Sequence, residues 1–168
     1  MGYRSSNDRF GVVRTPSQVA VMKACEELIV AFCDLVDAGD LDGALGLHLA
    51  DAIFNDVNGA KVCGHERIAA WLSKVRLSYP GRSTLHVPSN LRFARVTESE
   101  AECRVIIALY DLTKLDGDKI AYAARPSLRR VVAEAIRFSL GPSGDWRFRE
   151  RSLSFLTGDL PTASEATA

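Results

Sequence analysis

The sequence lacks the features of a membrane protein or of a nucleic-acid-binding protein. No apolar run approaches the roughly 20 residues that are needed to cross a bilayer. The 21 Lys and Arg residues balance the 21 Asp and Glu residues, so no excess charge indicates nucleic acid or an anionic membrane as a partner. Residues 1–14 are polar and contain no apolar segment typical of a secretory signal, and we therefore expect a cytoplasmic protein.

Cysteine is scarce and forms no metal-binding motif. The four cysteines lie far apart, with no Cys-x-x-Cys pair; they are Cys25, Cys33, Cys63 and Cys103. Each of them falls within an apolar pattern. We expect buried, reduced thiols, no metal site and no cofactor.

The chain has the length and composition of one globular domain. Its 168 residues are 47% apolar and 25% charged, which is enough to bury one sizeable core. No internal repeat or linker divides the chain. We expect a flexible arm over residues 1–14, one domain over residues 15–157 and a flexible tail over residues 158–168.

Helix signals are concentrated in the first half of the chain. Thr15 and Gln18 fit a capping box, Pro16 fits the first helical position, and Gly39 fits the residue that ends this helix. Apolar residues at three- and four-residue spacing predict helices over residues 16–38, 40–49 and 65–77.

Strand signals dominate the second half. Asn58-Gly59 lies between two short β-prone runs and predicts a tight hairpin. Alternating segments predict longer strands over residues 84–96, 101–115, 128–140 and 146–155, while residues 119–125 fit a short strand or an ordered loop. Helices at the front and strands at the back predict an α+β fold, with helices on one face of a curved antiparallel sheet.

Four segments in this order resemble the SnoaL-like branch of the nuclear transport factor 2-like superfamily. They are Asp37-Ala38-Gly39-Asp40-Leu41-Asp42, Gly64-His65-Glu66-Arg67-Ile68, His86-x-x-x-Asn90 and Gly144-Asp145-Trp146-Arg147-Phe148. The resemblance implies a cone-shaped fold, in which a strongly curved, mixed or antiparallel sheet wraps around the N-terminal helices. A pocket would open at the wide end of the cone.

The resemblance also implies a type of chemistry. Relatives include ketosteroid isomerase, scytalone dehydratase and polyketide cyclases, while others only bind proteins. The enzymes need no cofactor: a carboxylate or imidazole in an apolar pocket removes a proton next to a carbonyl, and hydrogen-bond donors stabilise the enolate.

His86 is the first candidate for a catalytic residue. It matches the His-x-x-x-Asn strand, and a pocket-facing imidazole suits acid/base work near neutral pH. The alternative is a histidine held by hydrogen bonds in the sheet or at a dimer face. Asn90 shares a face with His86 if no bulge intervenes, and it is a candidate for substrate binding. Pro88 between them favours a bulge.

Two carboxylates are candidate catalytic partners of His86. Asp111 follows Val105, Ile107 and Leu109 at alternate positions, so it ends an apolar strand face. Asp56 lies in the short hairpin, where the alternative is a solvated turn residue.

Further candidates for substrate contact come from the first helix and from aromatic residues. Asp37 and Phe32 lie near the points where dehydratase-like relatives have a catalytic Asp and Tyr; Phe32 lacks the hydroxyl, and Asp37 also fits a capping or solvated role. Tyr79 and Tyr122 are possible hydrogen-bond donors, and Trp71 fits either the pocket or the core.

The charged residues of the last two strands leave alternatives open. Arg147, Arg149 and Arg151 alternate with Trp146, Phe148 and Glu150; they fit salt bridges at the surface or at an interface, or an arginine that holds an acidic substrate. Glu134 fits a buried carboxylate or an edge charge.

Together these patterns predict a cofactor-independent isomerase, dehydratase or cyclase that acts on a small hydrophobic molecule, steroid-, polyketide- or terpenoid-like. The alternative is a non-catalytic ligand-binding or interaction module. Because a curved sheet with one uncovered face usually needs a second layer, we expect a homodimer.

Overall fold

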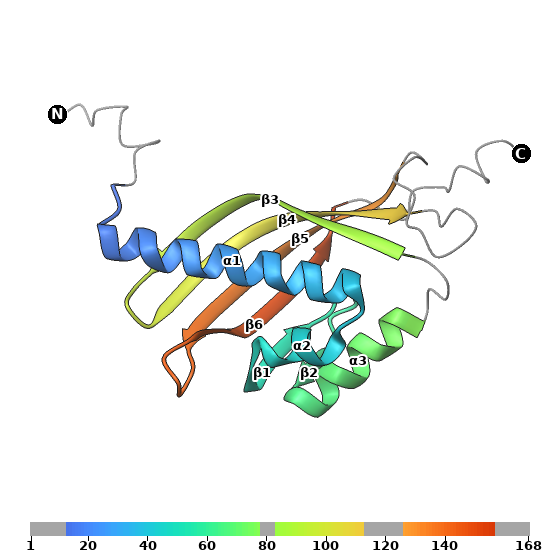
Figure 1. Ribbon diagram of the computed structural model, residues 1–168, viewed down its shortest axis with the longest axis horizontal. Coiled ribbons are helices and arrows are strands. Elements are labelled where there is room, and N and C mark those ends of the chain that lie inside the picture. The colour runs from blue at the N-terminus through green and yellow to red at the C-terminus, as the bar shows by residue number, and fades with distance from the viewer. Residues whose placement is uncertain (1–12, 78–82, 113–125, 157–168) are drawn as a thin grey trace, which may run out of the picture.

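A computed structural model describes residues 13–77, 83–112 and 126–156 (Figure 1). The elements are α1 (Pro16–Ala38), α2 (Leu41–Gly46), β1 (His48–Asn55), β2 (Lys61–Cys63), α3 (His65–Leu77), β3 (Ser83–Val96), β4 (Glu100–Leu112), β5 (Ser127–Leu140) and β6 (Trp146–Phe155). Within these ranges, no helix is long and apolar enough to cross a membrane.

The helix α1 has the ends that its sequence predicts. The Thr15 side chain accepts a hydrogen bond from the Gln18 backbone N–H at 3.2 Å, and the Gln18 side chain accepts one from the Thr15 N–H at 3.1 Å. Gly39 ends the helix with φ of 83°, a left-handed conformation that suits glycine. The Gln18 amide also donates to the Val96 carbonyl, which ties the start of α1 to the end of β3.

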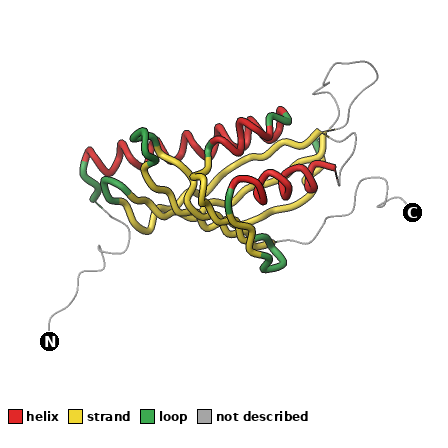
Figure 2. Tube along the Cα trace, turned by 90° about the horizontal axis from the view of Figure 1, so that it is seen from below, coloured by secondary structure: helices red, strands yellow, loops and turns green. Residues whose placement is uncertain are grey.

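The six strands form one curved, unclosed sheet in the order β2-β1-β6-β5-β4-β3. All neighbouring pairs are antiparallel except β1 and β6, which run parallel. Figures 1 and 2 show α1 lying along one face of the sheet while the strands bend beneath it. The α+β class and the curved sheet are therefore confirmed, and the sheet is mixed.

Two details differ from the prediction, and a third prediction lies partly outside the described residues. The second helix ends at Gly46 because the chain already turns into β1 at His48, where the prediction continued the helix to residue 49. The strand predicted over residues 101–115 is described only as far as Leu112. Cys63, which we expected to be buried, is an exposed free thiol on the short strand β2, whereas Cys25, Cys33 and Cys103 are buried.

An ion pair lies inside the cone, between α1 and the sheet. Glu134 on β5 is fully buried and Arg151 on β6 is 4% exposed. The Arg151 guanidinium makes two hydrogen bonds to the Glu134 carboxylate and lies 3.7 Å from the centre of the Phe32 ring. Removing one partner of such a buried ion pair leaves an uncompensated charge in the core. The stability of the fold therefore depends on the presence of both Glu134 and Arg151.

A bulge explains why Arg151 faces inward. The register of β5 and β6 shifts between Arg137 and Phe138, so that Phe148 and Arg151 share the inner face while Glu150 pairs with Arg137 outside. Strict alternation would have placed Arg151 and Phe148 on opposite faces.

His48 is a second buried polar group, 2% exposed, between the rings of Phe32 and Phe148. Its Nδ1 donates to the Ala44 carbonyl at 3.0 Å, and its Nε2 has no hydrogen-bond partner among the described residues. Burial, and then the positive charge of Arg151, lower the pKa of His48 to about 3. The neutral imidazole is thus the form that the folded core accepts.

We predict that His48 makes the fold sensitive to acid. The unfolded chain binds a proton at His48 below its ordinary pKa of about 6.5, while the folded chain does not until pH 3 is approached. Stability is therefore lost as the pH falls through this window, by roughly 2–3 kcal/mol between pH 6 and pH 4 from this residue. Urea unfolding of the wild type and His48→Gln at both pH values measures the effect.

The comparison uses the change with pH and not the absolute stability, because other carboxylates titrate in both proteins. Between pH 6 and pH 4, His48→Gln should lose roughly 2–3 kcal/mol less stability than the wild type. Equal losses in the two proteins would show that His48 is not the cause.

Candidate functional site

A carboxylate and an imidazole meet where the C-terminal end of α1 approaches the start of β3, an end of the molecule that we call the wide end. Asp37 lies in the last turn of α1, and its Oδ1 is 2.5 Å from His86 Nδ1. The Asp37 Oδ2 accepts a hydrogen bond from the His86 backbone N–H at 2.7 Å. The Thr84 hydroxyl donates to Oδ1 at 3.2 Å. Asp37 therefore holds both the ring and the backbone of His86.

This geometry sets the state of the His86 ring. A proton on Nδ1 is donated to the carboxylate, which leaves Nε2 as the ring atom that can exchange a proton with another molecule. The side chains of His86 and Asp37 are 18% and 15% exposed, so the pair is shielded but reachable. A carboxylate at the C-terminal end of a helix opposes the helix dipole, and the contacts from β3 offset that cost.

The partner of His86 is Asp37, and not Asp111 or Asp56. Asp111 shares the inner sheet face: it lies opposite Thr84 on β3 and forms an ion pair with Arg129 at 3.6 Å. The apolar strand face that leads to Asp111 is as predicted, with Val105 and Ile107 buried.

Asp56 closes the predicted hairpin between β1 and β2. Its carboxylate accepts hydrogen bonds from the backbone N–H groups of Asn58 at 2.6 Å and Ala60 at 3.3 Å. These contacts are those of a turn aspartate. They give Asp56 a structural role in the turn, away from the Asp37–His86 pair.

Asn90 does not share the face of His86. The β3–β4 register shifts between Ser89 and Arg92, and Asn90 has a left-handed φ of 52° in this bulge, with an exposed side chain. The bulge lies two residues after Pro88, which cannot donate to a sheet hydrogen bond. A four-residue spacing preserves the face of a strand only where the strand is regular.

The remaining predicted contact residues are core residues or lie outside the described ranges. Phe32 is 7% exposed and covered by Arg151. Trp71 on α3 packs against Phe54, with ring centres 4.1 Å apart. Tyr79 and Tyr122 lie outside the described residues.

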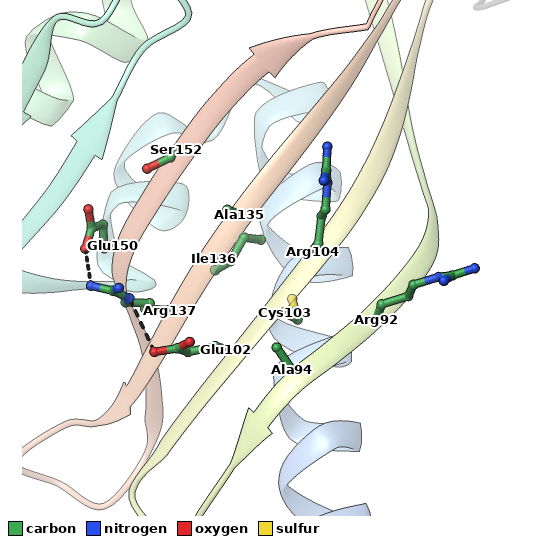
Figure 3. Close-up of a pocket in the computed structure, with 10 residues that line it drawn as sticks. All are labelled: Arg92, Ala94, Glu102, Cys103, Arg104, Ala135, Ile136, Arg137, Glu150 and Ser152. Atoms are coloured by element: carbon green, nitrogen blue, oxygen red, sulfur yellow. Dashed lines mark hydrogen bonds and ion pairs between the residues drawn. The ribbon is translucent and has the colours of Figure 1, made fainter. Parts of the chain in front are cut away.

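Two hollows lie on the sheet face turned away from α1, which we call the outer face. The smaller, about 300 Å³, is drawn in Figure 3, where Arg137 bridges Glu102 and Glu150. The other, about 450 Å³, adjoins it near Arg95. Neither includes the Asp37–His86 pair. Because Glu102 and Glu150 in these hollows are already paired with the exposed Arg137, we assign the candidate chemistry to the inner face.

In the ranges that the structure describes, no group of three or more His, Cys, Asp or Glu side chains lies close enough to hold a metal ion. The groups that can act at the wide end are those of the sheet and of α1.

Comparisons of the folded chain identify its architecture. Aln2 from a Streptomyces species is 13% identical and superposes with a TM-score of 0.71, over 85% of this chain and 94% of that one. An NTF2-like protein with a cystatin-like fold from Novosphingobium aromaticivorans is 21% identical, with a TM-score of 0.64 over 94% and 97%. The chain therefore has the nuclear transport factor 2-like, cystatin-like fold.

A third structure of this fold contains a ligand. A Catenulispora acidiphila protein in complex with S-DNPA is 14% identical, with a TM-score of 0.69 over 82% of this chain and 95% of that one. No family model and no curated protein matches the chain. At these identities the likeness establishes the nuclear transport factor 2-like fold and no activity.

Sequence reasoning missed two groups at the wide end. The pairing of Asp37 with His86 joins residues 49 positions apart, and no local pattern indicates it. Arg130 belongs to the same strand face as Val132 and Glu134, so the alternation of the β5 sequence contained a signal for it.

Proposed function

We propose that the chain is a cofactor-independent enzyme of isomerase, dehydratase or cyclase type, acting on a small hydrophobic molecule. The observation that carries this proposal is that Asp37 contacts both the backbone N–H and the ring Nδ1 of His86 at the wide end. A base oriented by a carboxylate is the arrangement that general acid/base catalysis needs.

In this proposal His86 Nε2 takes a proton from a carbon next to a carbonyl. The C–H electron pair moves onto the carbonyl oxygen as an enolate, and Asp37 stabilises the positive charge that forms on the imidazole. The same nitrogen then returns the proton to another carbon, which completes an isomerisation. Alternatively, the enolate carbon attacks a second carbonyl and closes a ring, and the alkoxide that forms takes the proton back from Nε2. Tyr79 and Tyr122 remain proposed donors to the enolate oxygen.

The surroundings of Phe32 favour isomerase or cyclase chemistry within this class. The dehydratases that the sequence resembles use a tyrosine near this point, whereas Phe32 has no hydroxyl and its ring is covered by Arg151. Asp111 is the proposed second carboxylate, since it lies opposite Thr84 on the inner face.

A non-catalytic binding module is the second candidate. The same site could hold a ligand without any proton transfer, and fold alone does not decide between the two. The conformation that Asp37 imposes on His86 favours the enzyme, because ligand binding alone does not require an oriented base.

We further propose a homodimer formed through the outer face. One end of this face carries an apolar row, Val87, Ala108 and Val131, which are partners in consecutive strands. The other end carries the exposed ion pairs of Arg137 with Glu102 and Glu150. A surface with apolar and alternating charged parts can match a second copy of itself around a two-fold axis.

We predict that light scattering after size exclusion gives twice the chain mass of 18.3 kDa. Ala108→Arg should shift the protein to the monomer, because it introduces a charge into the apolar row. Lys23→Gln, on the exposed side of α1, is the matched control and should leave the dimer intact. A monomeric wild type would contradict the proposal.

We predict that the protein catalyses a generic proton abstraction. In 5-nitrobenzisoxazole, removal of the C3 proton breaks the N–O bond and gives a coloured nitrile-phenolate, so the assay needs no natural substrate. His86→Asn should lower the rate about 10²–10⁴-fold, the range of a general base. Asp37→Asn should lower the rate about 10-fold or more, because a neutral amide stabilises the positive charge on the imidazole less than a carboxylate does.

Asp34→Asn is the control, because Asp34 lies exposed on the same helix and should keep the wild-type rate. A wild-type rate equal to that of His86→Asn would favour the binding module.

A further inference from the structure

The Thr84 hydroxyl is one of three donors that converge on the Asp37 carboxylate. It donates to Oδ1 at 3.2 Å, and the same oxygen lies 2.5 Å from His86 Nδ1. The third donor is the His86 backbone N–H, which reaches Oδ2 at 2.7 Å. Thr84 and His86 lie two positions apart on β3, so their side chains share one face of the strand. One strand thus supplies all three hydrogen bonds.

The plane of the Asp37 carboxylate is set by these hydrogen bonds. The torsion that turns an aspartate carboxylate joins an sp³ carbon to an sp² carbon, and its preferences are broad. The backbone N–H of His86 fixes Oδ2, and the Thr84 hydroxyl is the donor to Oδ1 that does not depend on the His86 ring. These two groups therefore fix the carboxylate plane independently of the ring that the carboxylate must meet.

The Thr84 hydroxyl proton goes to Asp37 although a second carboxylate lies across the sheet. Asp111 is the partner of Thr84 on β4, and directly opposed residues share a face. Asp111 forms its ion pair with Arg129, at 3.6 Å. Thr84 is half-buried, and the side chains of Asp37 and His86 are 15% and 18% exposed. A hydrogen bond to a charged acceptor is stronger where water is largely excluded.

We propose that Thr84 is a positioning residue, whose hydroxyl orients the Asp37 carboxylate and thereby the imidazole of His86. This inference rests on the proposed function, since it adds a residue to the same site. Thr84 contacts no reacting atom and acts through Asp37 alone. Its hydrogen bond keeps Oδ1 in place for the Nδ1 proton, so that Nε2 is held in one direction when it takes a proton.

The test is a double-mutant cycle on the elimination of 5-nitrobenzisoxazole. Thr84→Val removes the hydroxyl with little change of shape, and it should lower the rate about 3–10-fold, the usual effect of one lost hydrogen bond. Thr84→Ser keeps a hydroxyl and should restore most of the rate. In the Asp37→Asn background, Thr84→Val should change the rate by less than about 2-fold, because the carboxylate through which Thr84 acts is absent.

Nitrogen-15 and proton NMR of the His86 ring give a readout that does not depend on activity. Thr84→Val should move the Nδ1 proton signal to higher field, because its hydrogen bond to Asp37 is no longer aligned, and Thr84→Ser should not. Ser89→Ala is the matched control, because it removes another hydroxyl of β3, one that donates to the Ile106 carbonyl. It should equal the wild type in rate and in ring signals. Thr84→Ala replaces Thr84→Val if the valine variant does not fold.

Two results would overturn the positioning role while leaving the proposed function standing. One is a Thr84→Val protein with the rate and ring signals of the wild type. The other is equal slowing by Thr84→Val with and without the Asp37 carboxylate. A wild-type rate equal to that of His86→Asn would instead contradict the proposed function. In that case the ring signals decide on Thr84 alone: a shifted Nδ1 proton in Thr84→Val supports the positioning role, and an unchanged one overturns it.

Discussion

The candidate site depends on the contact between Asp37, on the helix α1, and His86, on the strand β3. α1 alone gives Asp37 an unfavourable position, since a carboxylate at a helix C-terminus opposes the dipole. β3 supplies what offsets it: a backbone N–H, a ring nitrogen and a hydroxyl, all directed at one carboxylate. The curvature of the sheet around α1 brings these groups within reach, so the site depends on the same packing that forms the core.

Two kinds of polar group lie between α1 and the sheet: fully buried groups in the core, and half-buried groups near Asp37 and His86. Glu134 and Arg151 lie deep in the cone and satisfy each other beneath Phe32. His48 lies nearby as a neutral imidazole, because burial and the Arg151 charge lower its pKa. These groups are buried and stabilise one packing of the core. The half-buried groups at the wide end come from α1, β3, β4 and β5.

The sequence was informative wherever a local rule decides the structure. The capping box at Thr15, the left-handed Gly39 and the Asn58-Gly59 hairpin follow from residue chemistry within a few positions. The inward alternation that ends at Asp111 also followed from period two. Pro88 indicated the bulge that turns Asn90 away from the face of His86, but no residue indicated the bulge that brings Arg151 inside.

Long-range pairing was equally out of reach from the sequence. The parallel contact of β1 with β6 and the contact of Asp37 with His86 join distant parts of the chain, and each depends on the finished fold. The family resemblance supplied the cone and named Asp37 as a candidate, but only the fold shows which group Asp37 contacts.

Nitrogen-15 NMR of the His86 ring, in the wild type and in Asp37→Asn, tests the central claim most directly. The account predicts a proton on Nδ1 in the wild type, with the low-field shift of a strong hydrogen bond to a carboxylate, and loss of that shift in Asp37→Asn. An unprotonated Nδ1 in the wild type, or the same ring signals in both proteins, would show that Asp37 does not orient His86.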